Sequence, residues 1–559
     1  MNTPRVLAAW AMPRRGVLML ALLLISGAGA FAAIPLKDVA NDATDPNNLS
    51  DTEPSIAVNP ANPQEIAIVS FSEGWDVTTP APVWKSADGG ATWTKERLIP
   101  QSPTSASGPG DQKLAYDAAG HLFVAELGFD VLDFVARQTG LTNTPLTAGA
   151  TYGNDQPHIA VDNSSTGTCA HRLYSPWLDT TQLNAHSMVS DSDNKGVTLT
   201  TLAAGDNAAF PNRTTRIAVA PDGKAYVVYK TREGAINSDF ETVHFRVARS
   251  DDCGASWNAL GAGGVSVHGT SPVTTYFTQS FGNSTKGFVN RARSSDAWIA
   301  VSPITGAVSV AFVNKDASGF AQIYVATSTN QGATWNSERA TDGTHNSAFP
   351  EIAVNDDGRI GVLFIDYDDS GAATLFRHHL LVSPFLGTQW VDEVLQTMDP
   401  STLSNALNGF IWGDYEGLTA HGTTFYGVFT GESIGRTIKQ LDPIFFSAAF
   451  LSFNIPKLIW ERDTRYLKIP VPWPCLQCPP VPNFNIAVDG DRSLWSVRLV
   501  GRGAERTEQR QRRTSTGVTI HMRAAVKSLE GLLLQFKRTE RARVDQAYQV
   551  KIAVTSAAH

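Results

Sequence analysis

Three consecutive side chains in the segment GFIWGDYEGL, residues 409–418, have types that can do chemistry on a bound substrate. Asp414 and Glu416 are acids, and Tyr415 between them carries a hydroxyl group. Because successive side chains of a strand point to opposite faces, Asp414 and Glu416 would face one way and Tyr415 the other. The sequence leaves two interpretations of Tyr415 equally open: a side chain with a chemical role, or a buried tyrosine that closes the last repeat.

A short apolar phrase of the type IAV recurs along the chain, and acidic residues precede it. In five of seven copies a carboxylate stands three or four residues before the phrase; with one arginine the positions are Glu53, Asp111, Asp155, Arg213, Asp296 and Asp414. Each acid alone is better explained as the cap of a turn. The uniform sign of the set favours a funnel lined with carboxylates, which would repel one another. Raised pKa values, or a bound cation such as Ca²⁺, would relieve that repulsion, although the sequence establishes no cofactor and no metal ligands.

The phrase is the first strand of a repeated hairpin. Its seven copies begin at residues 54, 113, 158, 216, 298, 351 and 416, and each reads as strand, turn, strand. Repeats of roughly fifty residues that are rich in short strands indicate a β-propeller. The sequence therefore predicts an all-β fold with about seven four-stranded blades, six being the alternative.

A second motif, S-x-D-x-G-x-x-W, follows the phrase by about thirty residues. Its three best copies contain Ser86, Asp88, Gly90 and Trp93; Ser250, Asp252, Gly254 and Trp257; and Ser328, Asn330, Gly332 and Trp335. The acid or amide can accept backbone hydrogen bonds in a tight turn, glycine can take a positive φ, and tryptophan can pack between sheets. The motif resembles the Asp-box, or BNR repeat, of the sialidase superfamily. In that family the boxes are structural and lie on the face opposite the active site.

The resemblance implies where function would lie. It assigns catalysis to Asp111, Tyr415 and Glu416, because sialidases use a tyrosine nucleophile with a glutamate and an aspartic acid/base. Residues expected to bind substrate are Glu53, Asp155, Asp179, Arg213, Asp296, Asp366 and Asp414. The arginine motif that precedes the first box in true sialidases is replaced here by TEPSIAV, so sialic acid is in doubt as substrate. The chain is closer to the secreted proteins loosely called exo-α-sialidases.

Three functions are compatible with this sequence. The first is an exported, sialidase-like glycoside hydrolase that acts on glycans at a central funnel. The second is a non-catalytic propeller that binds glycans or proteins, and the third is a lyase or hydrolase of another polysaccharide. The partner expected in each case is a carbohydrate or glycoconjugate. A net charge of −8 argues against nucleic acid as a partner.

The two ends of the chain differ from the repeats. Residues 1–32 have the basic lead, apolar run and small residues of a signal peptide, which predicts a secreted or periplasmic protein with no further membrane span; an uncleaved anchor is the alternative. We also expect a monomer. The propeller is expected over 45–455, a Pro-rich linker over 456–485 and a small β domain over 486–559. In the linker, Cys475 and Cys478 favour a local disulfide over half of a zinc site.

Overall fold

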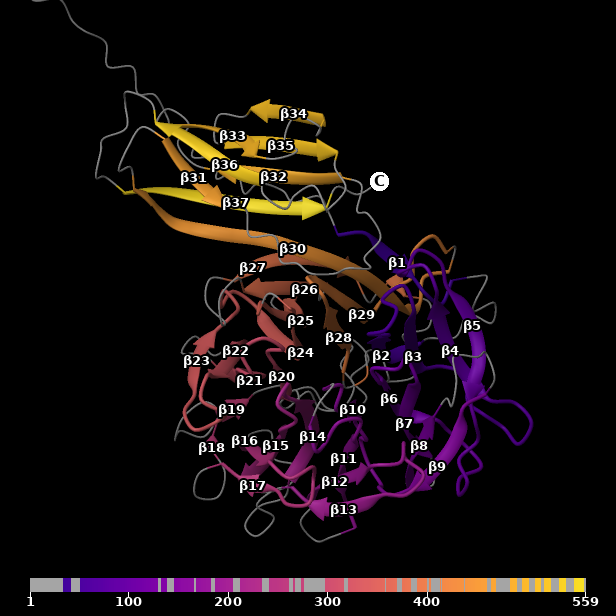
Figure 1. Cartoon of the computed structure of the whole chain (residues 1–559). Helices are drawn as coiled ribbons and strands as arrows, with labels where there is room; N and C mark the ends of the chain where they lie inside the picture. Colours follow the sequence, from indigo (N-terminus) through magenta and orange to yellow (C-terminus); the bar gives the residue numbers. More distant parts are fainter. Residues whose placement is uncertain are drawn as a thin grey trace, which may run out of the picture. The chain divides into compact units, whose positions relative to one another are not determined.

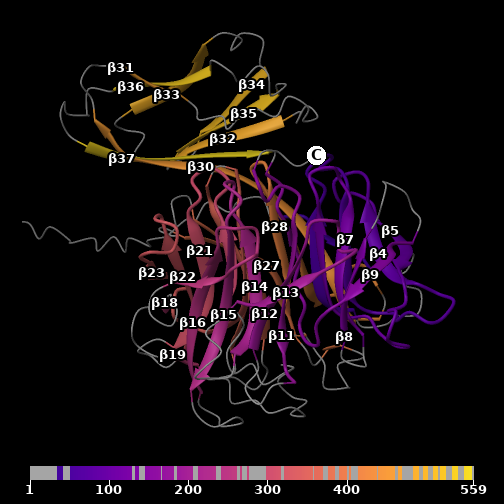
Figure 2. The same cartoon turned by 60° about the horizontal axis from the view of Figure 1, so that its bottom comes forward.

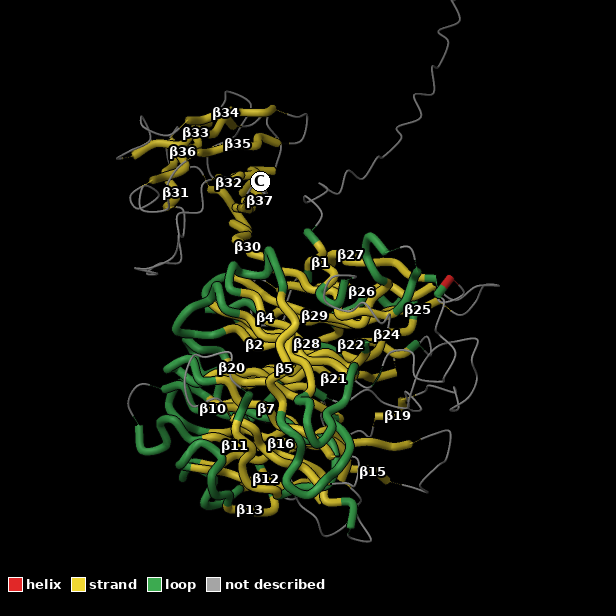
Figure 3. Tube along the Cα trace, turned by 90° about the vertical axis from the view of Figure 1, so that its right-hand side faces the viewer, coloured by secondary structure: helices red, strands yellow, loops and turns green. Residues whose placement is uncertain are grey.

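The fold is known from a computed structural model of the chain. It describes residues 34–41, 51–128, 132–137, 145–164, 167–181, 186–204, 212–233, 241–260, 265–266, 273–275, 297–315, 320–356, 358–368, 375–383, 390–399, 402–403, 413, 415–436, 438–459, 464–468, 483–489, 495–501, 508–513, 517–523, 532–538 and 547–556. Strands and loops make up this part of the chain, apart from a single helical residue at Thr402 (Figure 3). The fold is therefore all-β, as predicted.

Seven antiparallel sheets, the blades, stand around a central axis (Figure 1). Blade 1 contains β2 (Thr52–Val58), β3 (Ile66–Phe71), β4 (Ala81–Ser86) and β5 (Thr94–Ile99). Blade 2 contains β6 (Gly110–Tyr116), β7 (Leu122–Gly128), β8 (Leu132–Arg137) and β9 (Thr147–Thr151). Blade 3 contains β10 (Ala160–Val161), β11 (Leu173–Asp179), β12 (His186–Ser192) and β13 (Thr200–Ala203). Blade 4 contains β14 (Asn212–Val219), β15 (Ala225–Glu233), β16 (Glu241–Ser250) and β17 (Asn258–Ala259), with β18 (Val265–Ser266) and β19 (Val273–Thr275) also paired to β16.

The remaining blades repeat this order. Blade 5 is β20 (Trp298–Val301), β21 (Val308–Lys315), β22 (Ala321–Ser328) and β23 (Asn336–Arg339), and blade 6 is β24 (Asn346–Val354), β25 (Ile360–Asp368), β26 (Leu375–Ser383) and β27 (Val391–Met398). Blade 7 is β28 (Gly417–His421), β29 (Thr424–Glu432), the first part of β30 (Leu441–Ile459) and β1 (Leu36–Asp38). The seven copies of the apolar phrase correspond to the seven blades, which confirms the blade count.

The ring closes through its first strand. β1 pairs with β30, so a segment from the start of the chain becomes the outer strand of the last blade. Val39, which follows β1, joins the apolar cluster that contains Ile56 and Trp84 of blade 1 and Val428 and Phe445 of blade 7. The closure therefore combines strand pairing with apolar packing across the seam.

The blade topology creates two different faces. Because each sheet is antiparallel in chain order, the first strand begins at one face, and the turn between the third and fourth strands lies at the other. We call the first the entry face and the second the Asp-box face. Figure 2 shows the same blades from a second direction.

The Asp-box turns bind their own polar atoms. The Ser86 hydroxyl donates to Asp88 Oδ1 (2.8 Å) and accepts the Gly90 N–H, and Asp88 accepts the N–H and hydroxyl of Thr92. Gly90 has φ +93°, and a Cβ there would collide with the ring of Phe445. Asp252 accepts the same hydrogen bonds, and the bonds from the serine hydroxyl and the backbone N–H recur at Asn330 and, in the degenerate copy of blade 3, at Asn194. In these two turns the asparagine amide donates to the threonine hydroxyl, the reverse of the bond in the aspartate turns. The amide oxygen of asparagine thus accepts the backbone N–H that aspartate accepts elsewhere.

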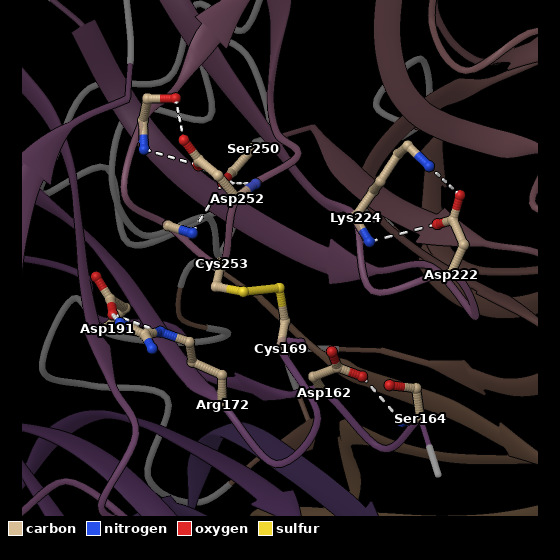
Figure 4. The surroundings of a disulfide bond; sticks show 12 residues. Asp162, Ser164, Cys169, Arg172, Asp191, Asp222, Lys224, Ser250, Asp252 and Cys253 are labelled. Carbon is tan, nitrogen blue, oxygen red and sulfur yellow. Dashed lines mark hydrogen bonds and ion pairs between the residues drawn. A yellow bond between two sulfur atoms is a disulfide. The ribbon is translucent and has the colours of Figure 1, made fainter. Parts of the chain in front are cut away.

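The tryptophans of the boxes pack against the preceding blade. Trp93 meets Phe445 of blade 7 edge-on, with ring centroids 5.1 Å apart, and Trp257 meets Tyr174 of blade 3 at 6.5 Å. A disulfide between Cys169 and Cys253 also joins blades 3 and 4 at the Asp-box face (Figure 4). Nearby, Arg172 pairs with Asp191 and donates from Nε at 2.7 Å. This face therefore holds neighbouring blades together.

The strands after the propeller form two further sheets. β30 pairs with β37 (Ala547–Ser556), which continues to β32 (Asn483–Asp489), β35 (Gly517–Arg523) and β34 (Glu508–Arg513); β36 (Leu532–Arg538) pairs with β31 (Thr464–Lys468) and β33 (Trp495–Gly501). β31 and the end of β30 fall inside the range expected as a linker. The exact division of this part of the chain remains a prediction.

Several predictions about the ends of the chain lie outside the described residues. These are the signal peptide and the pair Cys475 and Cys478. Within the described residues, no helix is long and apolar enough to cross a membrane.

Candidate active site at the propeller axis

The first strands enter the ring through a repeated distortion. In four blades, the residue three positions before the central Ile or Leu has a positive φ, between 47° and 54°. These residues are Glu53, Asp111, Gln156 and Phe349. In blades 1, 2 and 6 the pairing register shifts at this point, as expected for a β-bulge. Because Gln156 and Phe349 share the conformation, it belongs to the blade architecture and is not by itself a mark of chemistry.

Two of these positions carry acids that meet a tyrosine from the far end of the sequence. The Tyr415 hydroxyl donates to Asp111 Oδ1 at 3.2 Å, and Asp111 also shares a hydrogen bond with Glu53. Two carboxyl groups can share a hydrogen bond only when one of them holds a proton. Gly413, two residues before Tyr415, has φ +81°, and a Cβ there would collide with Glu53. This glycine lets the segment before β28 pass close to blade 1.

A second layer of side chains fills the axis beside this trio. Each comes from the residue immediately before the central Ile or Leu, and the layer contains Lys113, His158, Arg216, Trp298 and Glu351. All but His158 are less than one-tenth exposed. Lys113 Nζ lies 4.6 Å from the Trp298 ring centroid and 3.6 Å from Glu351 Oε1. Arg216 Cζ lies 4.8 Å from the same ring, and His158 meets it edge-on at 5.2 Å.

Lys113 connects the two layers. Its Nζ lies 3.5 Å from the centroid of the Tyr415 ring, within cation–π range. Burial lowers the pKa of Lys113 to about 8, against the attraction of Glu351. Burial also raises the pKa of Glu351 to about 8, although Lys113 opposes this change and the Leu418 N–H donates to Glu351 Oε2 at 2.6 Å. Both shifts show that the axis disfavours charge.

The acid of the trio is affected in the same way. Burial raises the pKa of Asp111, while the hydrogen bond from Tyr415 and the charges of Arg216 and Lys113 act in the opposite direction. The neighbouring Asp133, on β8, is fully buried, and burial together with the charges of Asp111 and Asp155 raises its pKa well above the usual value. The environment of Asp133 therefore favours the neutral carboxyl group.

Glu416 has a different environment from Tyr415. Glu416 Oε2 accepts the Thr430 N–H at 2.7 Å, and Oε1 lies 3.4 Å from His378 Nε2. Burial raises the pKa of Glu416 well above its usual value and lowers that of His378 to about 3. The contacts of Glu416 are thus with the body of blades 6 and 7.

The other residues expected to bind substrate are dispersed or undescribed. Asp155 lies near Asp133, Asp179 accepts the N–H and hydroxyl of Thr181 in its own turn, and Asp366 is held by Arg377 in blade 6. Asp296, Asp414 and the side chain of Arg213 lie outside the described residues. Three of the five acids that precede the apolar phrase are therefore described. Glu53 and Asp111 are in contact with each other, and Asp155 lies near Asp133.

Four residues of the axis stand outside the set of site residues predicted from the sequence: Lys113, Arg216, Glu351 and Asp133. The first three carried a readable signal, because the residue before the central Ile or Leu changes from blade to blade, while the next three positions stay mostly apolar. Alternation along a strand then predicts that this residue points into the axis. Asp133 had no comparable signal, because its role depends on how β8 packs beside Asp111.

Comparisons with known proteins give likenesses of fold alone. No protein-family model matches the chain, and no curated protein matches its sequence. Among solved structures, a Dyadobacter fermentans protein of unknown function is similar at 14% identity, covering 65% of this chain and 99% of that one, with a TM-score of 0.38. A Hadza microbial sialidase is similar at 13% identity (70% and 75% covered, TM-score 0.35), and an ulvan lyase of family PL25 at 8% (70% and 93%, TM-score 0.43). The seven blades themselves confirm the propeller that the sialidase-like motifs predict.

Proposed function

We propose that this chain is an exported glycoside hydrolase that cleaves glycans at the entry face of its propeller. The observation that carries the proposal is the hydrogen bond from the Tyr415 hydroxyl to Asp111, with Glu53 hydrogen-bonded to the same carboxyl group. A nucleophile, its base and a second acid are thereby assembled from three distant parts of the sequence. The resemblance of the Asp-boxes to those of sialidases adds to this assignment.

Each member of the trio has a chemical role in the proposal. Asp111 accepts the phenolic proton as Tyr415 Oη forms a bond to the anomeric carbon, and the glycosidic C–O bond breaks. The proton held by the Glu53–Asp111 pair passes through Glu53 to the leaving oxygen. The Lys113 ammonium over the tyrosine ring stabilises the phenolate. Water then attacks the anomeric carbon, and the bond from this carbon to Tyr415 Oη breaks. The proton transfers reverse, which returns both carboxyl groups to their starting states.

A non-catalytic glycan-binding propeller is the second candidate. It is favoured by the burial of Tyr415, which is 2% exposed, and by the closed layer of side chains beside it. A binding protein needs no accessible nucleophile, whereas a hydrolase must bring the anomeric carbon within about 3–3.5 Å of the hydroxyl oxygen.

The test is hydrolysis of 4-methylumbelliferyl α-sialoside and a panel of neutral 4-methylumbelliferyl glycosides. Tyr415→Phe and Asp111→Asn should each lower kcat/KM by roughly 100-fold or more on any substrate that is cleaved. Tyr116→Phe is the matched control for the tyrosine, because Tyr116 donates to Glu65 at the opposite end of β6. Asp252→Asn matches the aspartate change, because Asn330 already serves in the equivalent turn.

The outcomes separate the two candidates. Hydrolysis that survives both site variants would exclude this trio as the catalytic machinery. If no glycoside is cleaved but a glycan binds, and Asp111→Asn abolishes that binding, the second candidate is correct.

A further inference from the structure

A cavity of about 520 Å³ extends along blade 6, from the connection between β23 and β24 at the entry face to Trp390, which precedes β27 on the side of the Asp-box face. One wall comes from the outer strands β26 and β27, together with Trp390. This volume is within the range of small-molecule sites and exceeds what a single water cluster needs. The residues that line the cavity differ from those of the axial trio.

The polar groups of the cavity are fixed in place by one another. Arg377 donates to both oxygens of Asp366, from Nε at 2.7 Å and Nη2 at 3.2 Å. His379 lies between Asp366 and Asp392, at 3.2 Å and 2.8 Å, and its ring stacks on Phe364. Hydrogen bonds to the two aspartates raise the pKa of His379 to about 9, against burial, so the ring is positively charged at neutral pH.

These pairings nearly cancel the charge of the cavity. Arg377 and the His379 cation balance Asp366 and Asp392, which leaves Asp342 as the remaining acid of the lining. Asp342 already accepts the N–H and hydroxyl of Thr344. The lining is therefore unsuited to a strongly anionic ligand, while it offers donors and acceptors with fixed directions.

The apolar part of the lining points to the same ligand class. Trp390 is partly exposed, and Val394, four residues further along the chain on β27, is 54% exposed. An aromatic side chain beside rigid hydrogen-bonding groups suits a sugar ring, whose C–H face is apolar and whose rim carries hydroxyl groups.

We propose that this blade 6 cavity is a second ligand site, which binds a neutral oligosaccharide against Trp390 with its hydroxyl groups on Arg377 and Asp392. The site does not depend on catalysis at the axis. It would hold a glycan chain along blade 6, separate from the axial trio.

The experiment is isothermal titration calorimetry of the full chain with cellotetraose, xylotetraose, maltotetraose and mannotetraose, with tetragalacturonate as the anionic comparison. At least one neutral tetrasaccharide should bind saturably, and tetragalacturonate should not. Trp390→Ala should weaken binding by about tenfold, whereas Trp390→Phe should retain most of it. Val394→Arg provides a second test, because it places a long side chain at an exposed position of the lining and leaves the packed core unchanged.

Asp111→Asn separates this site from the axial one, and binding in that variant should be unchanged. The proposal is overturned if no neutral tetrasaccharide binds, if tetragalacturonate binds instead, or if a correctly folded Trp390→Ala or Val394→Arg variant binds as the wild type does. Loss of binding in Asp111→Asn alone would place the glycan at the axis and would also overturn it.

Discussion

The Asp-box face and the axis use polar residues in opposite ways. On the Asp-box face, four turns repeat one hydrogen-bond pattern with nearly the same residues, around Asp88, Asn194, Asp252 and Asn330. At the axis, one strand position carries a different side chain in each of five blades: Lys113, His158, Arg216, Trp298 and Glu351. A feature that every blade needs is repeated, while the residues at the shared centre complement one another and differ. In a propeller, variation at a fixed register position is therefore the better guide to a site.

The largest expected effect tests the axial layer. Lys113→Met should lower the free energy of unfolding at pH 7 by about 3–5 kcal/mol, because the negative charge that Glu53 and Asp111 share stays buried and loses a nearby cation. Chemical denaturation measures the change. Lys224→Met is the matched control: its pair with Asp222 is solvent-exposed, so its loss should cost less than about 1 kcal/mol. Equal losses in the two variants would contradict the special role of the axis.

The Asp-box face should show its own large effect through the disulfide. Cys169 and Cys253 are 84 residues apart in sequence and join two neighbouring blades. Replacing both by serine should cost about 2–4 kcal/mol, because the unfolded chain gains freedom. The melting temperature with and without reductant measures this, and reductant should shift the serine variant less than the wild type. If reductant leaves the wild-type melting temperature unchanged, the disulfide does not contribute to stability.

The sequence was a better guide to the repeated face than to the axis. The Asp-box residues form local turns, so spacing alone predicts their hydrogen bonds, and seven copies of one phrase predict seven blades. The contact of Tyr415 with Asp111 joins residues 304 positions apart, and only ring closure brings them together. Glu416 adjoins Tyr415 in sequence yet has other partners, because adjacent residues in extended chain face opposite ways.

A smaller effect should appear as a pH dependence of stability at the axis. The pKa of Glu351 is about 8 in the folded state and near 4.5 when unfolded, so the folded state binds more protons between these values. Stability should therefore fall as pH rises through this window, by about 1.4 kcal/mol between pH 6 and pH 7 from this group. Glu351→Gln should remove that part of the slope in denaturation curves measured at each pH. Lys113 does not affect this comparison below pH 8. Its pKa is about 8 in the folded state and near 10.5 in the unfolded state, so its contribution to stability changes with pH only above about 8. An unchanged slope in the variant would show that Glu351 titrates normally.

The smallest effect distinguishes hydrogen bonding from charge on the Asp-box face. Asp252 accepts the N–H and hydroxyl of Ser256 and the hydroxyl of Ser250. Asp252→Ala should therefore cost about 1 kcal/mol, because these donors lose their acceptor in a turn that water only partly compensates. Asp252→Asn should cost almost nothing, because Asn194 and Asn330 make the equivalent bonds in blades 3 and 5. Thermal unfolding of the two variants measures the difference. If the asparagine variant loses as much stability as the alanine variant, the turn depends on the negative charge of Asp252. Charge would then matter on the Asp-box face as it does at the axis, and the contrast between the two faces would be smaller.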